Sequence, residues 1–264
     1  MKKNQEKILR QKKIIQLVND RKKISTKELS IILNVSIMTI RRDLDSLEND
    51  NLIKRIHGYA ITTNYVSNDL RNHEQHCMKQ DSDKKTTEKK VKIARFAASL
   101  INEDDCIFID NGTTTECLTL FFPRDKNFTS LCNNISLLQG TLEYTNISLV
   151  IPGGYYNRED ESFSSDQAES FIRTFRANKV FLSASGIHKK LGITCINKHS
   201  TINKRAFIES AEERILLVDS TKFGVVTANH FAELSDIDLI ITDDGISGEW
   251  INFIQEMGVT LQIV

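Results

Sequence analysis

Hydrophobic residues in the first fifty positions recur three and four residues apart in three successive segments. This spacing places them along one face of a helix, so the pattern predicts three short helices. The first runs from Ile8 to about Val18, and the stretch Ser25–Glu28 is a capping box that opens the second. The expected inward-facing residues are Ile14, Leu17 and Val18, then Leu29, Ile32 and Leu33, then Ile40, Leu44 and Leu47.

The third helix combines an apolar stripe with a polar one that carries two adjacent arginines, Arg41 and Arg42. Ser36 is a suitable N-cap for it. Only Asn34 and Val35 separate it from the second helix, which is short enough for a helix-turn-helix bend. A helix that buries one face and presents arginines on another is suited to enter the major groove of DNA.

Residues 52–62 predict two short strands around His57-Gly58-Tyr59. Such a hairpin after three helices is the wing of a winged helix-turn-helix, which we assign to residues 1–62. The residues expected to contact DNA are Ser36, Met38, Thr39, Arg41, Arg42 and, in the wing, His57.

The distribution of charge supports this assignment. Residues 1–60 hold 14 lysines and arginines against 7 acidic residues, whereas the whole chain is balanced at 35 against 35. A basic end on an otherwise acidic protein is typical of a nucleic-acid-binding module. By themselves Arg41 and Arg42 favour a solvated helix face; together with the caps, the wing and the charge they favour DNA binding.

Several classes of protein are disfavoured. No apolar run approaches the ~20 residues of a membrane helix, and the basic N-terminus lacks the apolar core of a signal peptide. The five cysteines are odd in number and form no Cys-x-x-Cys pair, and Cys106, Cys117 and Cys132 lie in apolar segments that predict buried thiols. We therefore expect a cytoplasmic protein without disulfides, metal or cofactor.

Residues 63–90 are polar and lack apolar periodicity, which predicts a linker. His73 and His76 have a spacing that a metal site could use. No carboxylate or cysteine accompanies them with metal-ligand spacing, so a linker is the preferred interpretation.

From Val91 onward, short apolar runs alternate with helical segments, which predicts a doubly wound α/β domain over residues 91–264. The expected strands are 106–109, 128–131, 147–151, 179–182, 215–218 and 239–241. The expected helices are 91–101, 116–122, 164–176 and 201–212.

Small, hydroxylated and charged residues follow these strands. The segments are 110–115 (Asp-Asn-Gly-Thr-Thr-Thr), 132–134, 152–154, 183–186, 219–222 and 242–244. Ligands of open α/β sheets bind at the carboxyl ends of the strands, so these segments should converge on one site. Gly112 followed by three threonines at a helix start is suited to phosphate, and Lys204 and Lys222 could supply positive charge.

Along nearly its whole length the chain resembles the DeoR family of bacterial transcriptional regulators. The segments that carry the resemblance are 35–44, 110–115, 152–154, 185–186, 203–206 and 218–224. The resemblance implies a repressor whose second domain is similar to ribose-5-phosphate isomerase and binds a phosphorylated sugar as inducer. Segment 186–197 is most similar to the family's deoxyribose-operon member, which implies deoxyribose 5-phosphate.

We therefore predict an oligomeric repressor of a sugar or deoxyribonucleoside catabolism operon; an activator is an alternative that the residues leave open. Its partners would be double-stranded operator DNA and the inducer. The expected effector-binding residues are Asp110, Gly112, Thr113, Thr114, Thr115, Asn133, Gly153, Ser185, Gly186, Lys204, Asp219 and Lys222. The family's wing usually reads His-Gly-Gly-Ala; here Tyr59 replaces the second glycine, without its backbone freedom.

The alternative is an isomerase-like enzyme fused to a DNA-binding domain. Asp110, Asp219 and Lys222 would be its acids and bases, because proton transfer next to a carbonyl needs such groups. A catalyst has no need of a winged end, which favours a regulator without enzymatic activity.

Overall fold

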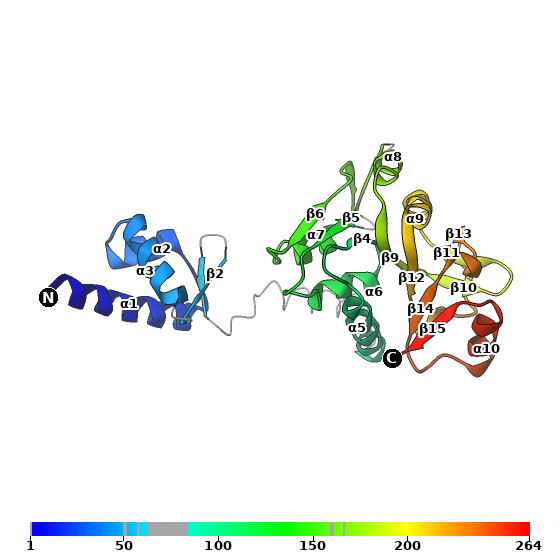
Figure 1. Cartoon of the computed structure of the whole chain (residues 1–264), viewed down its shortest axis with the longest axis horizontal. Coiled ribbons are helices and arrows are strands. Elements are labelled where there is room, and N and C mark those ends of the chain that lie inside the picture. The colour runs from blue at the N-terminus through cyan, green and yellow to red at the C-terminus, as the bar shows by residue number, and fades with distance from the viewer. Residues whose placement is uncertain (1, 50–51, 57–58, 63–83, 159–160, 166) are drawn as a thin grey trace. The chain divides into compact units, whose positions relative to one another are not determined.

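The computed structural model describes residues 2–49, 52–56, 59–62, 84–158, 161–165 and 167–264. The chain divides into two compact units, residues 1–67 and 68–264. We name them, after the roles that the sequence predicts for them, the DNA-binding unit and the sensor unit, and each is described separately (Figure 1). His57 and most of the predicted linker, 63–83, lie outside the described residues.

The DNA-binding unit contains the three predicted helices, α1 (Lys2–Arg21), α2 (Thr26–Leu33) and α3 (Ile37–Asn49). The predicted capping box is present: the Glu28 amide donates to Ser25 Oγ at 3.1 Å, and the Ser25 amide donates to the Glu28 carboxylate at 2.9 Å. Asn34, in the left-handed conformation (φ 50°), makes the bend between α2 and α3. Ile14, Val18, Leu29, Ile40, Leu44 and Leu47 are buried in one core, as predicted, and Leu17 and Leu33 pack against it partly buried. The prediction was wrong for Ile32, which is 44% exposed.

A three-stranded sheet completes this unit. The predicted wing strands are present as β2 (Lys54–Ile56) and β3 (Tyr59–Ile61). A strand that the sequence did not predict, β1 (Lys23–Ser25), pairs with β3 and gives the order β1-β3-β2. Tyr59 lies within β3, opposite both Ser25 and Ile56, and the Lys23 ammonium lies 4.8 Å from the centre of its ring.

The sensor unit is built on a seven-stranded parallel sheet in the order β15-β14-β12-β9-β4-β5-β6. All six predicted strands belong to it: β4 (Cys106–Ile109), β5 (Phe128–Cys132), β6 (Ile147–Val150), β9 (Ala177–Ser183), β12 (Ala211–Leu217) and β14 (Leu239–Thr242). The edge strand β15 (Thr260–Ile263) was missed, because Thr260 and Gln262 interrupt its apolar pattern.

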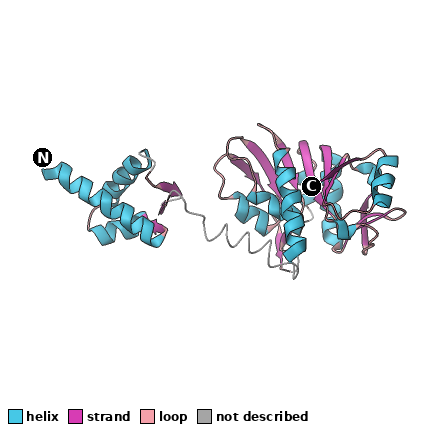
Figure 2. Ribbon diagram, turned by 90° about the horizontal axis from the view of Figure 1, so that it is seen from below, coloured by secondary structure: helices cyan, strands magenta, loops and turns pink. Residues whose placement is uncertain are grey.

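Helices cover both faces of the sheet (Figure 2), and each face carries its own hydrophobic layer, which confirms the doubly wound architecture. Along β4, Phe108 faces one layer while Ile107 and Ile109 face the other, as the two-residue period of a strand requires. One layer includes α5 (Lys84–Ser99), the 3-10 turn η1 (Cys117–Leu120) and α7 (Ile135–Thr141). The other includes α8 (Ala168–Ile172), α9 (Lys198–Ser210) and α10 (Gly248–Glu256).

Two smaller sheets flank the large one. Strands β10 (Gly186–His188), β11 (Gly192–Cys195) and β13 (Asn229–Ala232) form an antiparallel sheet, and β7 (Tyr155–Asn157) pairs with β8 (Ser162–Ser164). The remaining elements are short: α6 (Thr113–Glu116), η2 (Ser220–Lys222) and η3 (Leu234–Asp236). None of the described helices is both long and apolar enough to cross a membrane.

The predicted helix boundaries need correction. Helix α5 begins at Lys84 rather than at Val91, so residues 84–90, predicted as linker, are helical. Residues 164–176 form only the short helix α8, and Ser164 ends a strand. Residues 211 and 212, predicted as helix, belong to β12, because that strand extends to pair Ala211 with Ala177. The helix predicted over 116–122 is instead η1, which follows the single turn α6.

The DNA-binding unit supplies a test of what holds its helices together. Asp43 on α3 is buried and forms a two-point ion pair with Arg10 on α1, with Nη2–Oδ1 at 3.2 Å. Asp45, two residues further on, is exposed and pairs with Arg55. Asp43→Ala should destabilise this unit by about 2–3 kcal/mol, since it removes a buried carboxylate that makes two contacts with a partly buried guanidinium. Asp45→Ala should cost less than about 1 kcal/mol.

Urea unfolding of the full chain, followed by circular dichroism, measures the free energy of unfolding of the Asp43→Ala and Asp45→Ala variants. Equal effects of the two substitutions would contradict the assigned role of the Arg10–Asp43 pair.

Candidate functional site

The exposed face of α3 has the properties of a DNA-reading surface. Arg41 and Arg42 are exposed, Met38 is 55% exposed, and Ile40 is fully buried on the opposite face. Ser36 caps the helix by accepting the Thr39 amide at 3.2 Å, and the two hydroxyls lie 2.9 Å apart. The structure therefore gathers five of the six predicted DNA-contacting residues on α3 and at its N-cap; the sixth, His57, lies outside the described residues.

A pocket of about 570 Å³ lies at the carboxyl edge of the large sheet. The chain begins the sheet at β4 and adds β5 and β6 on one side of it. It then adds β9, β12, β14 and β15 on the other side of β4. The strand order thus reverses between β4 and β9, and this switch point is where open α/β sheets bind ligands. Of the predicted effector residues, Gly112, Thr113, Thr114, Ser185, Lys204 and Lys222 line the pocket.

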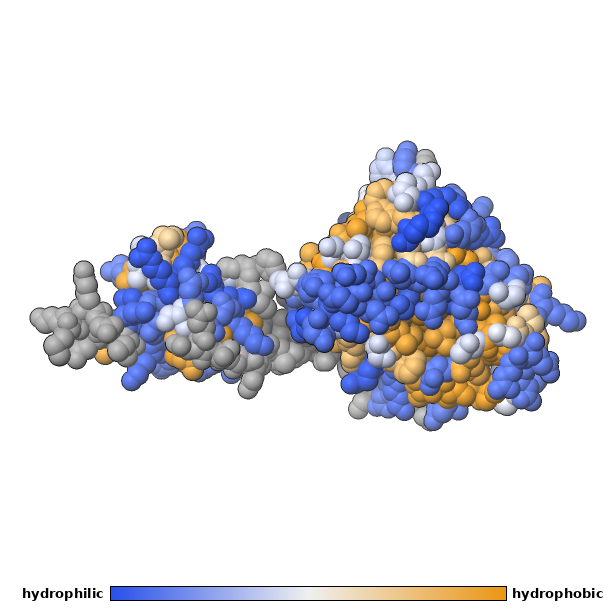
Figure 3. Space-filling model, viewed as in Figure 1, coloured by the Kyte–Doolittle hydropathy of each residue, from blue (hydrophilic) through white to orange (hydrophobic). Residues whose placement is uncertain are grey.

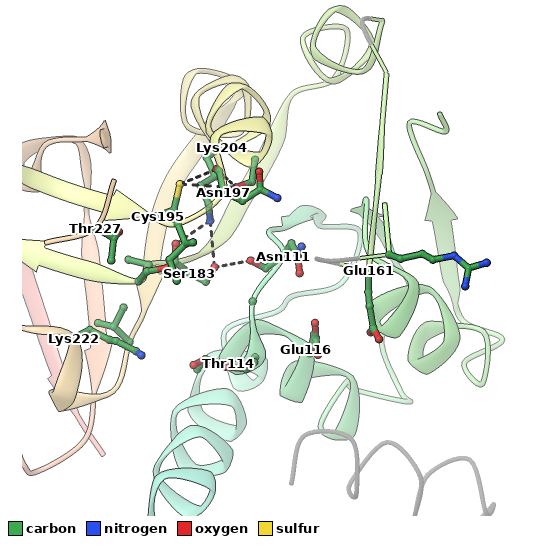
Figure 4. A pocket seen from close by; sticks show the side chains of 18 residues that line it. Asn111, Thr114, Glu116, Glu161, Ser183, Cys195, Asn197, Lys204, Lys222 and Thr227 are labelled. Carbon is green, nitrogen blue, oxygen red and sulfur yellow. Dashed lines mark hydrogen bonds between the residues drawn. The ribbon is translucent and has the colours of Figure 1, made fainter. Parts of the chain in front are cut away.

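A buried ion pair forms the floor of the switch point. Lys204 on α9 donates to the carboxylate of Asp110, which directly follows β4, and both residues are 2% exposed. Ser183, at the end of β9, donates its amide to the same Asp110 oxygen at 2.9 Å, with its hydroxyl 2.7 Å away. Lys204 also donates to the Ser183 carbonyl at 3.0 Å (Figure 4). Asp110 therefore binds protein groups and is not among the pocket-lining residues.

Position 112 must be glycine because Ser183 leaves no space for a side chain there. A Cβ placed on it would lie 2.4 Å from both the Cβ and the Oγ of Ser183. The N-cap of α6 is Gly112 itself, and no side chain caps this helix. The hydroxyl of Thr115 lies within hydrogen-bond distance of the carbonyls of Asp110 (2.6 Å) and Gly112 (2.8 Å). Thr115 therefore shapes the loop, while Thr113 and Thr114 line the pocket.

Two predicted residues are buried with an oxygen atom that has no hydrogen-bond partner within the described part of the chain. These atoms are Asn133 Oδ1 and Asp219 Oδ2. The other Asp219 oxygen accepts the Thr221 amide at 3.0 Å. Neither residue lines the pocket, and the same is true of Gly153 and Gly186.

The pocket also contains residues that the sequence analysis did not select. They come from α6, the β7–β8 connection, the end of β11, the start of α9 and the loop before β13, and include Glu116, Arg158, Glu161, Cys195, Asn197, Ser200 and Thr227. Figure 4 shows the labelled members surrounding one space, with Glu116 and Lys222 contributed from different sides. Asn111, Ser183 and Ala184 also line the pocket; they lie within predicted strand-end segments but were not selected. The pairing of Ser183 with Asp110 depends on the strand order.

The predicted buried thiols are found where expected. Cys117 and Cys132 are buried and Cys106 is partly buried; Cys77 lies outside the described residues. Burial raises the pKa of the Cys132 thiol to about 12, which keeps it protonated and unreactive at neutral pH.

Comparison with known proteins finds a matching protein family for each of the two units. The family model described as the DeoR C terminal sensor domain matches residues 85–244, and the model of the DeoR-like helix-turn-helix domain matches residues 10–65. The uncharacterized HTH-type transcriptional regulator YulB of Bacillus subtilis is 31% identical over 97% of this chain and 96% of its own length. The deoxyribose operon repressor of Escherichia coli is 26% identical over 96% of this chain and 98% of its own.

Among solved structures, ribose 5-phosphate isomerase A of Methanocaldococcus jannaschii matches 51% of this chain and 53% of its own, with 16% identity and a TM-score of 0.35. The family models span both units, and the match to YulB extends along nearly the whole chain. The chain belongs to the DeoR family of transcriptional regulators.

Proposed function

We propose that the chain represses a sugar or deoxyribonucleoside catabolism operon and is released from its operator by a phosphorylated sugar, deoxyribose 5-phosphate being favoured. The observation that carries the proposal is the switch-point pocket, which is lined by hydroxyls and lysines and belongs to a chain with a winged helix-turn-helix. The match to a deoxyribose operon repressor supports the choice of sugar.

In this proposal the phosphate lies near Gly112, Thr113 and Thr114, with Lys222 supplying positive charge. A dianion needs several donors, and Figure 4 shows the Lys222 side chain directed toward Thr114 from a different element.

The switch itself would be allosteric. Operator DNA and the sugar phosphate would weaken each other's binding reciprocally, with a coupling free energy of typically ~1–3 kcal/mol.

We propose a cytoplasmic homo-oligomer that places two recognition helices on paired half-sites. On the face seen in Figure 3, hydrophobic residues reach the surface of the sensor unit in broad patches. Exposed residues such as Tyr155 (85%) and Leu142 (58%) are consistent with an interface between copies.

We infer that the sensor unit binds its sugar phosphate without converting it. The relatives are named as regulators, and Asp110, one of the three acids and bases that an isomerase would need, is held by Lys204 and Ser183.

Arg41→Ala and Arg42→Ala test the DNA-reading surface. Each should weaken binding to an operator selected from a random-sequence library by ~1–3 kcal/mol if the arginine contacts guanine. A contact to phosphate should instead weaken binding to all sequences and flatten its salt dependence. Fluorescence anisotropy of labelled DNA measures both quantities. Lys92→Ala, an exposed lysine of the sensor unit, is the control. Unchanged affinity in both arginine variants would rule out this surface.

Thr114→Asp tests the phosphate site. Thr114 is 6% exposed and lines the pocket, so a carboxylate there would face the phosphate dianion. The affinity for deoxyribose 5-phosphate should fall by more than about 100-fold, since like charges repel strongly in a partly buried site. Thr114→Asn has the same shape without the charge and should retain measurable binding. Operator affinity should be unchanged in both, and release of the operator by normal inducer concentrations in Thr114→Asp would refute the site.

A further inference from the structure

Two consecutive lysines of α5 reach the loops at the carboxyl edge of the sheet. Lys90 donates to the Thr113 hydroxyl at 2.7 Å. Lys89 binds the Asp243 carboxylate at 2.7 Å and the Ser220 hydroxyl at 2.9 Å. Asp243 follows β14 and Ser220 follows β12, so Lys89 joins one helix to two strand-end loops. Lys89 itself is not a pocket-lining residue.

The contact of Lys89 belongs to a closely fitted cluster. Asp243 is 1% exposed and accepts the Ser220 amide at 2.6 Å, the Gly245 amide at 3.0 Å and the Lys89 ammonium. A Cβ on Gly245 would lie 2.5 Å from Ser220 Oγ and 3.0 Å from Lys89 Nζ. The absence of a side chain at position 245 is therefore what lets the lysine, the serine and the aspartate meet.

Both partners of the ion pair remain charged under ordinary conditions. Burial by itself would raise the pKa of Asp243, but hydrogen bonds from Lys89, Ser220 and Gly245 outweigh it and leave that pKa lowered. The hydrogen bond to Asp243 raises the pKa of Lys89 against desolvation, and the charges of Asp243, Asp219 and Asp244 raise it further. The attraction is therefore present from below the normal pKa of aspartate to above that of lysine.

The cluster fixes the start of a segment that ends in the pocket. Ser220 is the first residue of η2 and Lys222, which lines the pocket, is its last. The next residue, Phe223, packs against Trp250 with 5.3 Å between ring centres. Lys222 is thus held between an anchor at Ser220 and an aromatic contact at Phe223.

We propose that Lys89 is a positioning residue: through Asp243 and Ser220 it fixes the loop after β12 and so places Lys222 at the effector pocket. The assignment rests on the proposed function, in which Lys222 receives the phosphate. It also makes α5, which is the first described element after residues 63–83, part of the structure that senses the effector.

Hydrogen exchange of the effector-free full chain tests the positioning directly. Lys89→Met keeps the length of the side chain and removes its charge, and Lys92→Met is the matched control on the exposed side of the same helix. Amides of residues 219–224 should exchange about tenfold faster in Lys89→Met, because loss of a charged hydrogen bond makes opening of this loop easier. Lys92→Met should match the parent chain. Unchanged protection of residues 219–224 in Lys89→Met would overturn the proposal.

Titration with deoxyribose 5-phosphate, followed by calorimetry and by fluorescence of the single tryptophan, tests the consequence for binding. The Kd should rise on the order of tenfold in Lys89→Met, and Lys89→Arg should restore most of the affinity because a guanidinium can also bind Asp243. Asp243→Asn should weaken binding similarly, and the double variant should show little additional loss.

Fully additive losses, or no rescue by arginine, would overturn the positioning role. Failure of the parent chain to bind the sugar phosphate would refute the proposed ligand instead, while the exchange experiment would still decide the role of Lys89.

Discussion

A carboxylate and an ammonium group are buried together where the large sheet reverses its strand order. Asp110 and Lys204 are each 2% exposed, and charges can be buried to this extent only when they are paired and hydrogen-bonded. Their pairing requires α9 to lie across the ends of β4 and β9, and Ser183 completes the set of donors. The loop 110–115 then passes so close to Ser183 that only glycine fits at position 112. The position of the loop 110–115, which forms one wall of the pocket, therefore depends on the buried Asp110–Lys204 pair.

The opposite side of the pocket depends on a second ion pair of a different kind. Lys89 and Asp243 fasten the loop after β12 from α5, and the lysine side chain is still 23% exposed. One side is therefore fixed by a pair within the core of the sheet and the other by a pair at its edge. Removal of a partly exposed partner is tolerated by the fold more readily than removal of a buried one. In our proposal the β12 side is accordingly the part of the pocket that responds to the effector without loss of the core.

The sequence was sufficient to predict the architecture, because the signals for it are local. Apolar runs located six of the seven strands of the large sheet, and the Ser25–Glu28 box located α2. Elements defined by tertiary contacts were missed: β1 exists because it pairs with β3, and the lysine-rich start of α5 is helical although it lacks apolar periodicity. The pocket was located only in outline, since the partners of Asp110 and the nearness of Glu161 or Thr227 depend on strand order and loop path. Which predicted residues touch the effector and the DNA stays a prediction.

Reciprocal coupling between sugar phosphate and DNA tests the account most directly. The affinity of the full chain for deoxyribose 5-phosphate would be measured by calorimetry with and without an operator selected from a random-sequence library. The operator affinity would be measured with and without the sugar phosphate. We predict that each ligand weakens the binding of the other ligand by the same factor, on the order of 5- to 150-fold. Binding of both ligands with no mutual effect would contradict it.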